Sequence, residues 1–197
     1  MTLPGLESKD IDRSRIGLKD HVEAIQEAVL AESSPVVLAV HSAAAISGYV
    51  VSDRIPEKIA AMVYVDTFPQ KSAMNPDFEA DEMPIPPMEE LDEADIRGMS
   101  AEHLQLLQQR AVPVPGGVVR DAPVLENEKR LDVPSTVICT SHSSEEIKAM
   151  MKKGYDWISG LAELHNVTYV DLPTHHWPMW THPKELASII GETAKNS

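Results

Sequence analysis

Residues 35–45 of the sequence read PVVLAVHSAAA, and this stretch decides what kind of fold the chain adopts. The run at residues 36–40 is short, apolar and rich in β-branched residues, which predicts a strand buried on both faces. Small residues follow Ser42, and residues 43 to about 53 are expected to be helical. The stretch therefore predicts a buried parallel strand that turns directly into a helix, with Ser42 at the turn.

The alternation of strand and helix continues along the chain. Three further strands are expected at residues 60–65, 135–140 and 167–171, and helices at residues 18–31, 145–153, 156–164 and 183–194. Such alternation implies right-handed crossover connections and a parallel sheet covered by helices. The predicted class is α/β, a parallel sheet with flanking helices in a single domain spanning residues 1–197.

Residues 67–133 break this rhythm, and we expect them to form an insertion that lies over the sheet. Prolines punctuate its first part, and residues 77–95 hold nine acidic residues and no basic one. A helix is expected near residues 100–110, with Ser100 as its cap. Two interpretations are open: a solvated acidic loop, or a cap over a pocket, because long insertions at the carboxyl ends of strands often cover active sites.

Composition limits the kinds of partner. A chain of 197 residues with 43% hydrophobic content forms one domain with a sizeable core. The net charge of −14 argues against nucleic acid or an anionic membrane as the main partner. One cysteine, Cys139, cannot form an intrachain disulfide, and no secretory leader or spanning segment is recognisable. We expect a cytoplasmic protein that acts on a small molecule.

The position of Ser42 indicates chemistry. A residue between a parallel strand and the next helix lies at the carboxyl edge of the sheet, where open α/β folds bind ligands. At a sharp turn the hydroxyl projects above the sheet, and the N–H of Ala43 can stabilise an oxyanion. A serine nucleophile also needs a base within hydrogen-bond reach. Residues 172–180, after the last predicted strand, supply histidines at the same edge.

Two segments resemble the α/β-hydrolase superfamily, in particular its small bacterial hydrolases of unassigned substrate. The first, residues 35–69, contains VVLAVHS and IPEKIAAMVYVDTFP, and the second, residues 169–180, reads YVDLPTHHWPMW. The resemblance implies Ser42 as the nucleophile and His176 as the base, with His175 where the family usually has glycine. The oxyanion donor is then Ala43.

The acid that orients the base is less direct to assign. Many relatives place an aspartate after the next-to-last strand, but residues 140–146 contain none here. Glu146 is explained as part of a capping box with Ser143. Asp66, which ends the strand after the serine's helix, is a position that some relatives use; we predict it as the acid, with a purely structural role as the alternative. Asp171 is expected to be a strand-end hydrogen-bond acceptor.

Two departures from the family pattern affect the expected structure. Val40 and Ala44 replace the glycines of Gly-x-Ser-x-Gly, and a β-branched valine would strain or tilt the turn. The family's first strands, with the loop that gives a second oxyanion donor, have no counterpart in the sequence. We therefore expect an N-terminally truncated α/β-hydrolase fold with a cap inserted after the second strand. The serine's strand then becomes an exposed edge, which favours a homodimer through that edge.

Two functional hypotheses follow. The first is a serine hydrolase, without a cofactor, that cleaves an ester or similar acyl bond through Ser42 and His176, with Asp66 as the acid. The second is a noncatalytic hydrolase-like domain that keeps the pocket for binding. His175, His176 and His182 cluster in the sequence, but neighbouring loop residues rarely converge on one ion, so no metal site is predicted.

Overall fold

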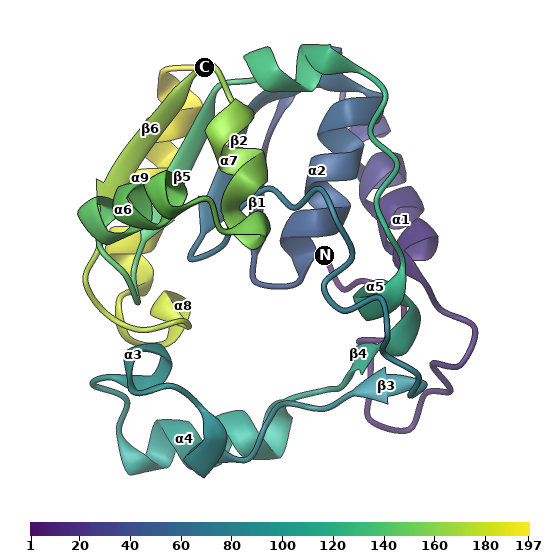
Figure 1. Ribbon diagram of the computed structural model, residues 1–197, viewed down its shortest axis with the longest axis vertical. Helices are drawn as coiled ribbons and strands as arrows, with labels where there is room; N and C mark the ends of the chain where they lie inside the picture. The colour runs from purple at the N-terminus through teal and green to yellow at the C-terminus, as the bar shows by residue number, and fades with distance from the viewer.

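The computed structural model describes residues 1–197 and contains a four-stranded sheet in the order β1-β2-β5-β6 (Figure 1). Every neighbouring pair of strands is parallel. The expected parallel sheet is therefore confirmed. Its strands are β1 (Val36–His41), β2 (Ile59–Val65), β5 (Ser135–Cys139) and β6 (Val167–Asp171).

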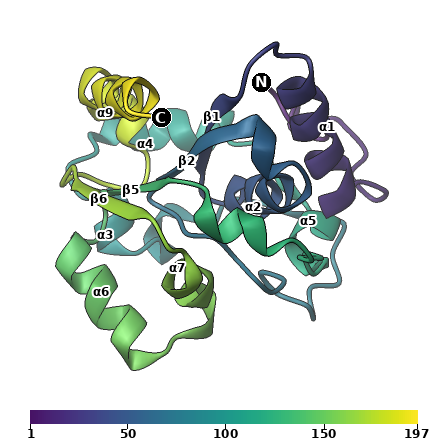
Figure 2. The same ribbon diagram turned by 90° about the horizontal axis from the view of Figure 1, so that it is seen from above.

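Helices cover both faces of the sheet (Figure 2). One face carries α1 (Leu18–Leu30), α2 (Ala44–Arg54), α6 (Ser144–Lys153) and α7 (Ser159–Glu163), and the other carries α9 (Pro183–Lys195). Short 3₁₀ turns η1 (Pro56–Lys58) and η4 (Asp156–Ile158) and helix α8 (Pro178–Thr181) complete this part of the chain. No helix combines the length and the apolar character needed to cross a membrane.

The side chains of each strand point alternately to the two faces of the sheet, and the hydrophobic core is therefore divided into two clusters. Along β2, Met62 and Tyr64 belong to a cluster of 19 buried residues shared with α1 and α2, whereas Val63 and Val65 join a cluster of four with Leu186 of α9. Successive strand side chains point to opposite faces, so a strand covered on both faces must be apolar throughout. Nearly all residues of the interior strands β2 and β5 are buried, and β2 meets this condition. Strand β5 departs from it only at Ser135 and Thr136, whose buried hydroxyls take part in hydrogen bonds.

Strand β1 differs from these interior strands. It lies at the edge of the sheet and pairs only with β2. Within it only Val40 is fully buried, and Ala39 is exposed. The expectation that the serine's strand forms an exposed edge is therefore confirmed. The prediction, drawn from its apolar run, that this strand is buried on both faces is wrong, because an edge strand has no neighbouring strand to shield its outer side. Dimerisation through this edge stays a prediction.

Val40, which was expected to strain the turn at Ser42, is accommodated by Gly48 in the helix that follows this turn. A Cβ atom placed on Gly48 of α2 would lie 2.5 Å from Cγ1 of Val40. Real side-chain atoms do not approach that closely, so the glycine lets α2 pack against the valine. The strand-to-helix turn thus depends on a complementary pair, Val40 and Gly48.

Replacing Gly48 by alanine is expected to destabilise the protein by about 1–3 kcal/mol, because overpacking outweighs alanine's better helix propensity. Gly191→Ala in α9 is the control, since a Cβ there meets nothing within 4 Å, and it should be neutral or mildly stabilising. Urea unfolding followed by circular dichroism measures both. A Gly48→Ala protein as stable as the wild type, or a Val40→Ala/Gly48→Ala double variant no more stable than Gly48→Ala alone, would contradict the pairing.

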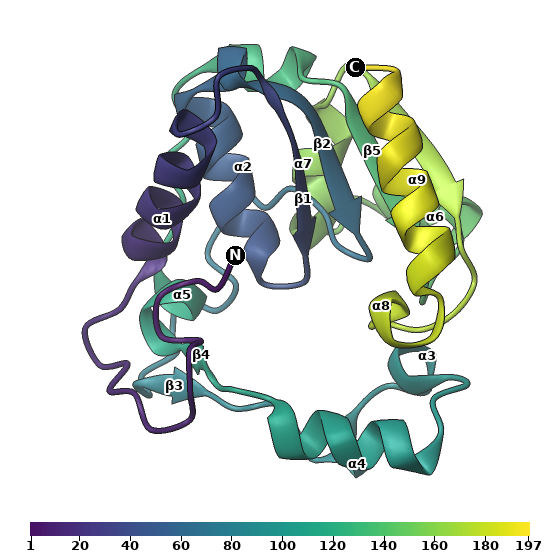
Figure 3. The same cartoon turned by 180° about the vertical axis from the view of Figure 1, so that it is seen from behind.

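The insertion, residues 67–133, lies beyond the carboxyl ends of the strands for much of its length (Figure 3). Eight of its nine acidic residues between positions 77 and 95 are exposed to solvent, and the half-buried Asp95 is the exception. Ser100 caps the expected helix by accepting a hydrogen bond from the His103 amide at 3.1 Å. Its elements are β3 (Glu82–Met83), η2 (Met88–Glu90), α3 (Glu93–Ile96), α4 (Ala101–Arg110), β4 (Val114–Pro115), α5 (Gly116–Arg120) and η3 (Glu128–Asp132).

Candidate active site

Ser42 occupies a sharp turn between β1 and α2. Its φ of +52° lies in the left-handed region, which is strained for a residue with a side chain. Its carbonyl oxygen accepts hydrogen bonds from the Ala45 amide at 3.0 Å and from the Thr67 hydroxyl at 3.1 Å. Ala43 stands at the N-cap of α2, where backbone N–H groups lack helical partners. The turn therefore presents a hydroxyl beside unpaired amide donors.

A hydrogen-bonded chain connects three side chains that are far apart in the sequence. The Ser42 hydroxyl lies 3.0 Å from Nε2 of His176, and Nδ1 of the same ring lies 2.8 Å from Oδ2 of Asp66. Ser42 follows β1, Asp66 follows β2 and His176 lies in the loop after β6. The structure thus brings together the predicted nucleophile, base and acid. With the proton on Nδ1, the imidazole accepts from the serine and donates to the carboxylate.

Asp66 is held by more than the histidine. Its φ of +46° is also left-handed, and its carboxylate accepts hydrogen bonds from the Thr140 amide at 3.1 Å, the Ser141 amide at 2.9 Å and the Ser141 hydroxyl at 2.6 Å. Burial alone would raise the pKa of Asp66, but the hydrogen bonds from His176 and Ser141 outweigh it and hold this pKa well below its ordinary value. Asp66 is therefore a fixed anion beside the imidazole.

The other acids considered from the sequence have structural partners. Glu146 accepts a hydrogen bond from the Ser143 amide, and Ser143 in turn caps the Glu146 amide, which is the predicted capping box of α6. Asp171 accepts from the amide of Ser144 at 2.6 Å and from its hydroxyl at 2.8 Å. Both carboxylates therefore act as helix-end acceptors.

Two histidines beside the site fix the loop that carries His176. Nε2 of His41 donates to the carbonyl oxygen of His176 at 2.6 Å, and the two rings lie 4.6 Å apart. Burial, with the neighbouring His176, lowers the pKa of His41 to about 4, so His41 is neutral near pH 7. His175 is fully buried and accepts from the Trp177 amide at 3.1 Å. Neither role was apparent from the sequence, although His41 directly precedes the serine.

Ser42 and His176 open into a cleft of about 530 Å³. Most of its walls are apolar, and many come from the insertion. The acidic-loop and cap interpretations of the insertion therefore describe different side chains. All the acidic residues between positions 77 and 95 except Asp95 are exposed to solvent, whereas apolar residues of the insertion line the cleft. The apolar lining from the insertion consists of Met74, Met83, Pro84, Ile85, Pro86, Leu91, Leu107, Ala111, Val112, Val114 and Val118.

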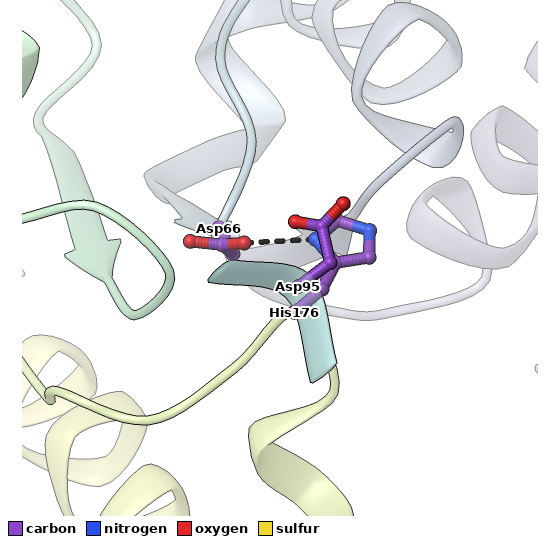
Figure 4. Close-up of side chains that lie close together, drawn as sticks. All are labelled: Asp66, Asp95 and His176. Atoms are coloured by element: carbon purple, nitrogen blue, oxygen red, sulfur yellow. Dashed lines mark hydrogen bonds and ion pairs between the residues drawn. The ribbon is translucent and has the colours of Figure 1, made fainter. Parts of the chain in front are cut away.

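Asp95 brings a second carboxylate to the histidine (Figure 4). One atom each from Asp66, Asp95 and His176 lie within 4.8 Å of one another, a spacing that could in principle hold a metal ion. The oxygens of Asp66, however, already accept four hydrogen bonds, including the one from His176. A metal would have to displace that bond, so the donor set fits an ion poorly.

Comparison with known proteins identifies the fold. No protein-family model and no curated protein matches the chain. A pyrethroid hydrolase from Sphingobium faniae JZ-2 is similar in structure, with a TM-score of 0.67 and 18% identity over 98% of this chain and 84% of that one. An extracellular α/β-hydrolase from a Paenibacillus species gives a TM-score of 0.70 and 13% identity over 93% and 81%. Polyneuridine aldehyde esterase gives 0.62 and 17% over 90% and 80%.

These likenesses settle the architecture. The chain has the α/β-hydrolase fold, as the resemblance of residues 35–69 and 169–180 implied. At such low identity the comparison concerns the fold alone.

Proposed function

We propose that the protein is a serine hydrolase that cleaves an ester or a similar acyl bond. The observation that carries this proposal is the unbroken chain of hydrogen bonds from Ser42 through His176 to Asp66. A serine, a histidine and an aspartate linked in this way form a nucleophile, a base and an orienting acid on several unrelated folds. The hydrolase and esterase activities named for two of the similar structures give further support.

In the first half of the reaction Ser42 attacks the carbonyl carbon of the ester. His176 takes the hydroxyl proton at Nε2 as the bond to carbon forms, and Asp66 stabilises the resulting imidazolium. Negative charge develops on the carbonyl oxygen, and the Ala43 amide at the start of α2 donates to it. The tetrahedral intermediate then collapses, and the leaving alcohol receives the proton from His176. Ser42 is left as an acyl ester.

In the second half water repeats the attack. His176 removes a proton from the water, the acyl–Ser42 bond breaks, and the acid product leaves while the serine recovers its proton. No cofactor takes part in these steps. The mostly apolar cleft favours a small, neutral substrate with an apolar acyl or alcohol group, because burying an unpaired charge there would be costly.

A fluorophosphonate activity probe tests this proposal directly. Its phosphorus is attacked by an activated serine, so the wild-type protein is expected to be labelled and Ser42→Ala to remain unlabelled. Ser47→Ala is the matched control, since Ser47 is a buried serine of α2 without a hydrogen-bond partner, and it should be labelled like the wild type. Equal labelling of wild type and Ser42→Ala would remove Ser42 from the mechanism. A folded wild type that never labels would favour the noncatalytic binding domain.

A further inference from the structure

Asp95 is set apart from the acidic run around it. The other acidic residues between positions 77 and 95 are exposed, as expected of charges that keep their water, whereas Asp95 is half-buried and lines the cleft. Burial raises the pKa of the Asp95 carboxyl above its ordinary value. Removing a carboxylate from water is unfavourable unless a neighbouring group stabilises its charge.

Two contacts connect Asp95 to His176. The His176 amide donates to the main-chain oxygen of Asp95 at 3.1 Å, which ties α3 of the insertion to the loop after β6. The Asp95 carboxylate lies within 4.8 Å of the ring of His176. Figure 4 shows the two side chains close together with no hydrogen bond between them. Its influence on the ring is therefore through charge rather than through a directed bond.

Several other titratable groups surround the ring of His176, and their charges determine how much the Asp95 carboxylate matters. Asp66 faces the ring from the end of β2, and His41 faces it from β1. His175 adjoins it on the same loop, and His142, from the loop after β5, is close enough to interact with Asp95. His41 is neutral near pH 7 and adds no charge beside the imidazole. The carboxylates that lie next to the imidazole are those of Asp66 and Asp95.

We propose that Asp95 is a positioning residue that brings a second negative charge from the insertion to His176 and thereby favours the imidazolium that forms as Ser42 reacts. This inference rests on the proposed hydrolase function. It makes the strength of the base depend on residues 92–97 lying against the His176 loop. The insertion then contributes to the chemistry as well as to the walls of the cleft.

The test compares Asp95→Asn with Asp92→Asn. Both variants remove one negative charge from the same segment, but Asp92 is exposed and caps α3 without a side-chain bond. Loss of the Asp95 charge leaves the imidazole neutral down to lower pH, so the acid limb of kcat/KM for p-nitrophenyl acetate should move down by about half to one pH unit. The value of kcat at its plateau should fall about three- to tenfold, because the imidazolium is less stabilised. Asp95→Glu should restore much of both.

A measurement independent of activity separates this inference from the proposed function. Proton NMR follows the titration of the His176 ring, assigned by its disappearance in His176→Gln, and its midpoint should move to lower pH in Asp95→Asn but not in Asp92→Asn. If the wild type is inactive, the proposed function fails while this midpoint still decides the role of Asp95. A midpoint that is the same in both variants overturns the inference, whether or not the protein is a hydrolase.

Discussion

Replacing His176 by alanine is expected to lower kcat for p-nitrophenyl butyrate by on the order of 10⁴-fold or more, because the nucleophile, base and acid of such a site act as a unit. Without the imidazole, the Ser42 hydroxyl has no acceptor for its proton. Steady-state kinetics at neutral pH measures the loss. Added imidazole should restore part of the rate by entering the space that the ring leaves, which a merely structural defect would not permit.

His165→Ala is the matched control for this experiment. His165 also places Nδ1 2.8 Å from an aspartate oxygen, that of Asp132, but this pair is exposed at the surface. The control removes the same chemical group from the same kind of contact and should leave kcat within about twofold, because exposed pairs contribute little. If His176→Ala kept more than a few per cent of the wild-type rate, His176 would not be the base.

Asp66→Asn is expected to lower kcat by about 10⁴-fold, the loss seen when the orienting acid of a serine triad becomes an amide. If the amide oxygen keeps the bonds from the Thr140 and Ser141 amides, which Oδ1 now accepts, the NH₂ group takes the place of Oδ2 and faces His176 Nδ1–H and the Ser141 hydroxyl. The imidazole would then turn or change tautomer, and Ser42 would lose its base. Ester hydrolysis and unfolding measured on the same sample separate the catalytic loss from the structural one.

The contribution of Asp66 to the free energy of unfolding should depend on pH and become smaller in acid. Because the pKa of Asp66 is lowered in the folded protein, its stabilising contribution is fully present above the ordinary pKa of 3.8 and is lost as the pH falls below it. The stability difference between wild type and Asp66→Asn should therefore shrink under acid. Asp171→Asn is the control, since Asp171 likewise ends a strand and accepts from a serine amide and hydroxyl. It should leave kcat nearly unchanged; a loss equal to that of Asp66→Asn would contradict the assignment.

The sheet and the convergence of the three side chains were predictable because they follow from one rule. Parallel strands end at the same edge, so residues directly after strands meet there. Ser42 and Asp66 each follow a short apolar strand, and His176 lies in the loop after the last one, so their sequence positions specify their common location. The alternating apolar residues of β2 similarly fix which side chains face each core.

The remaining features depend on packing between distant segments, and a single sequence does not reveal them. Nothing in the acidic run distinguishes Asp95 from its eight exposed neighbours, because its position depends on how the insertion folds back onto the His176 loop. Predicting that Gly48 makes room for Val40 requires knowledge of how closely α2 packs against β1, and the sequence does not give this distance. The apolar run of β1 alone indicated burial on both faces, because such a run looks the same at an edge as in the middle of a sheet; only the missing first strands of the family pattern indicated the edge position.

The strand order has a mechanical consequence. Ser42 is attached to one outer strand, β1, and the loop of His176 to the other, β6, while Asp66 projects from between them. The distance between the attacking oxygen and its proton acceptor is therefore set by the breadth and twist of the whole sheet. A slight change of twist, produced by any group that wedges between the inner strands, would be transmitted to that distance although it touched no reacting atom.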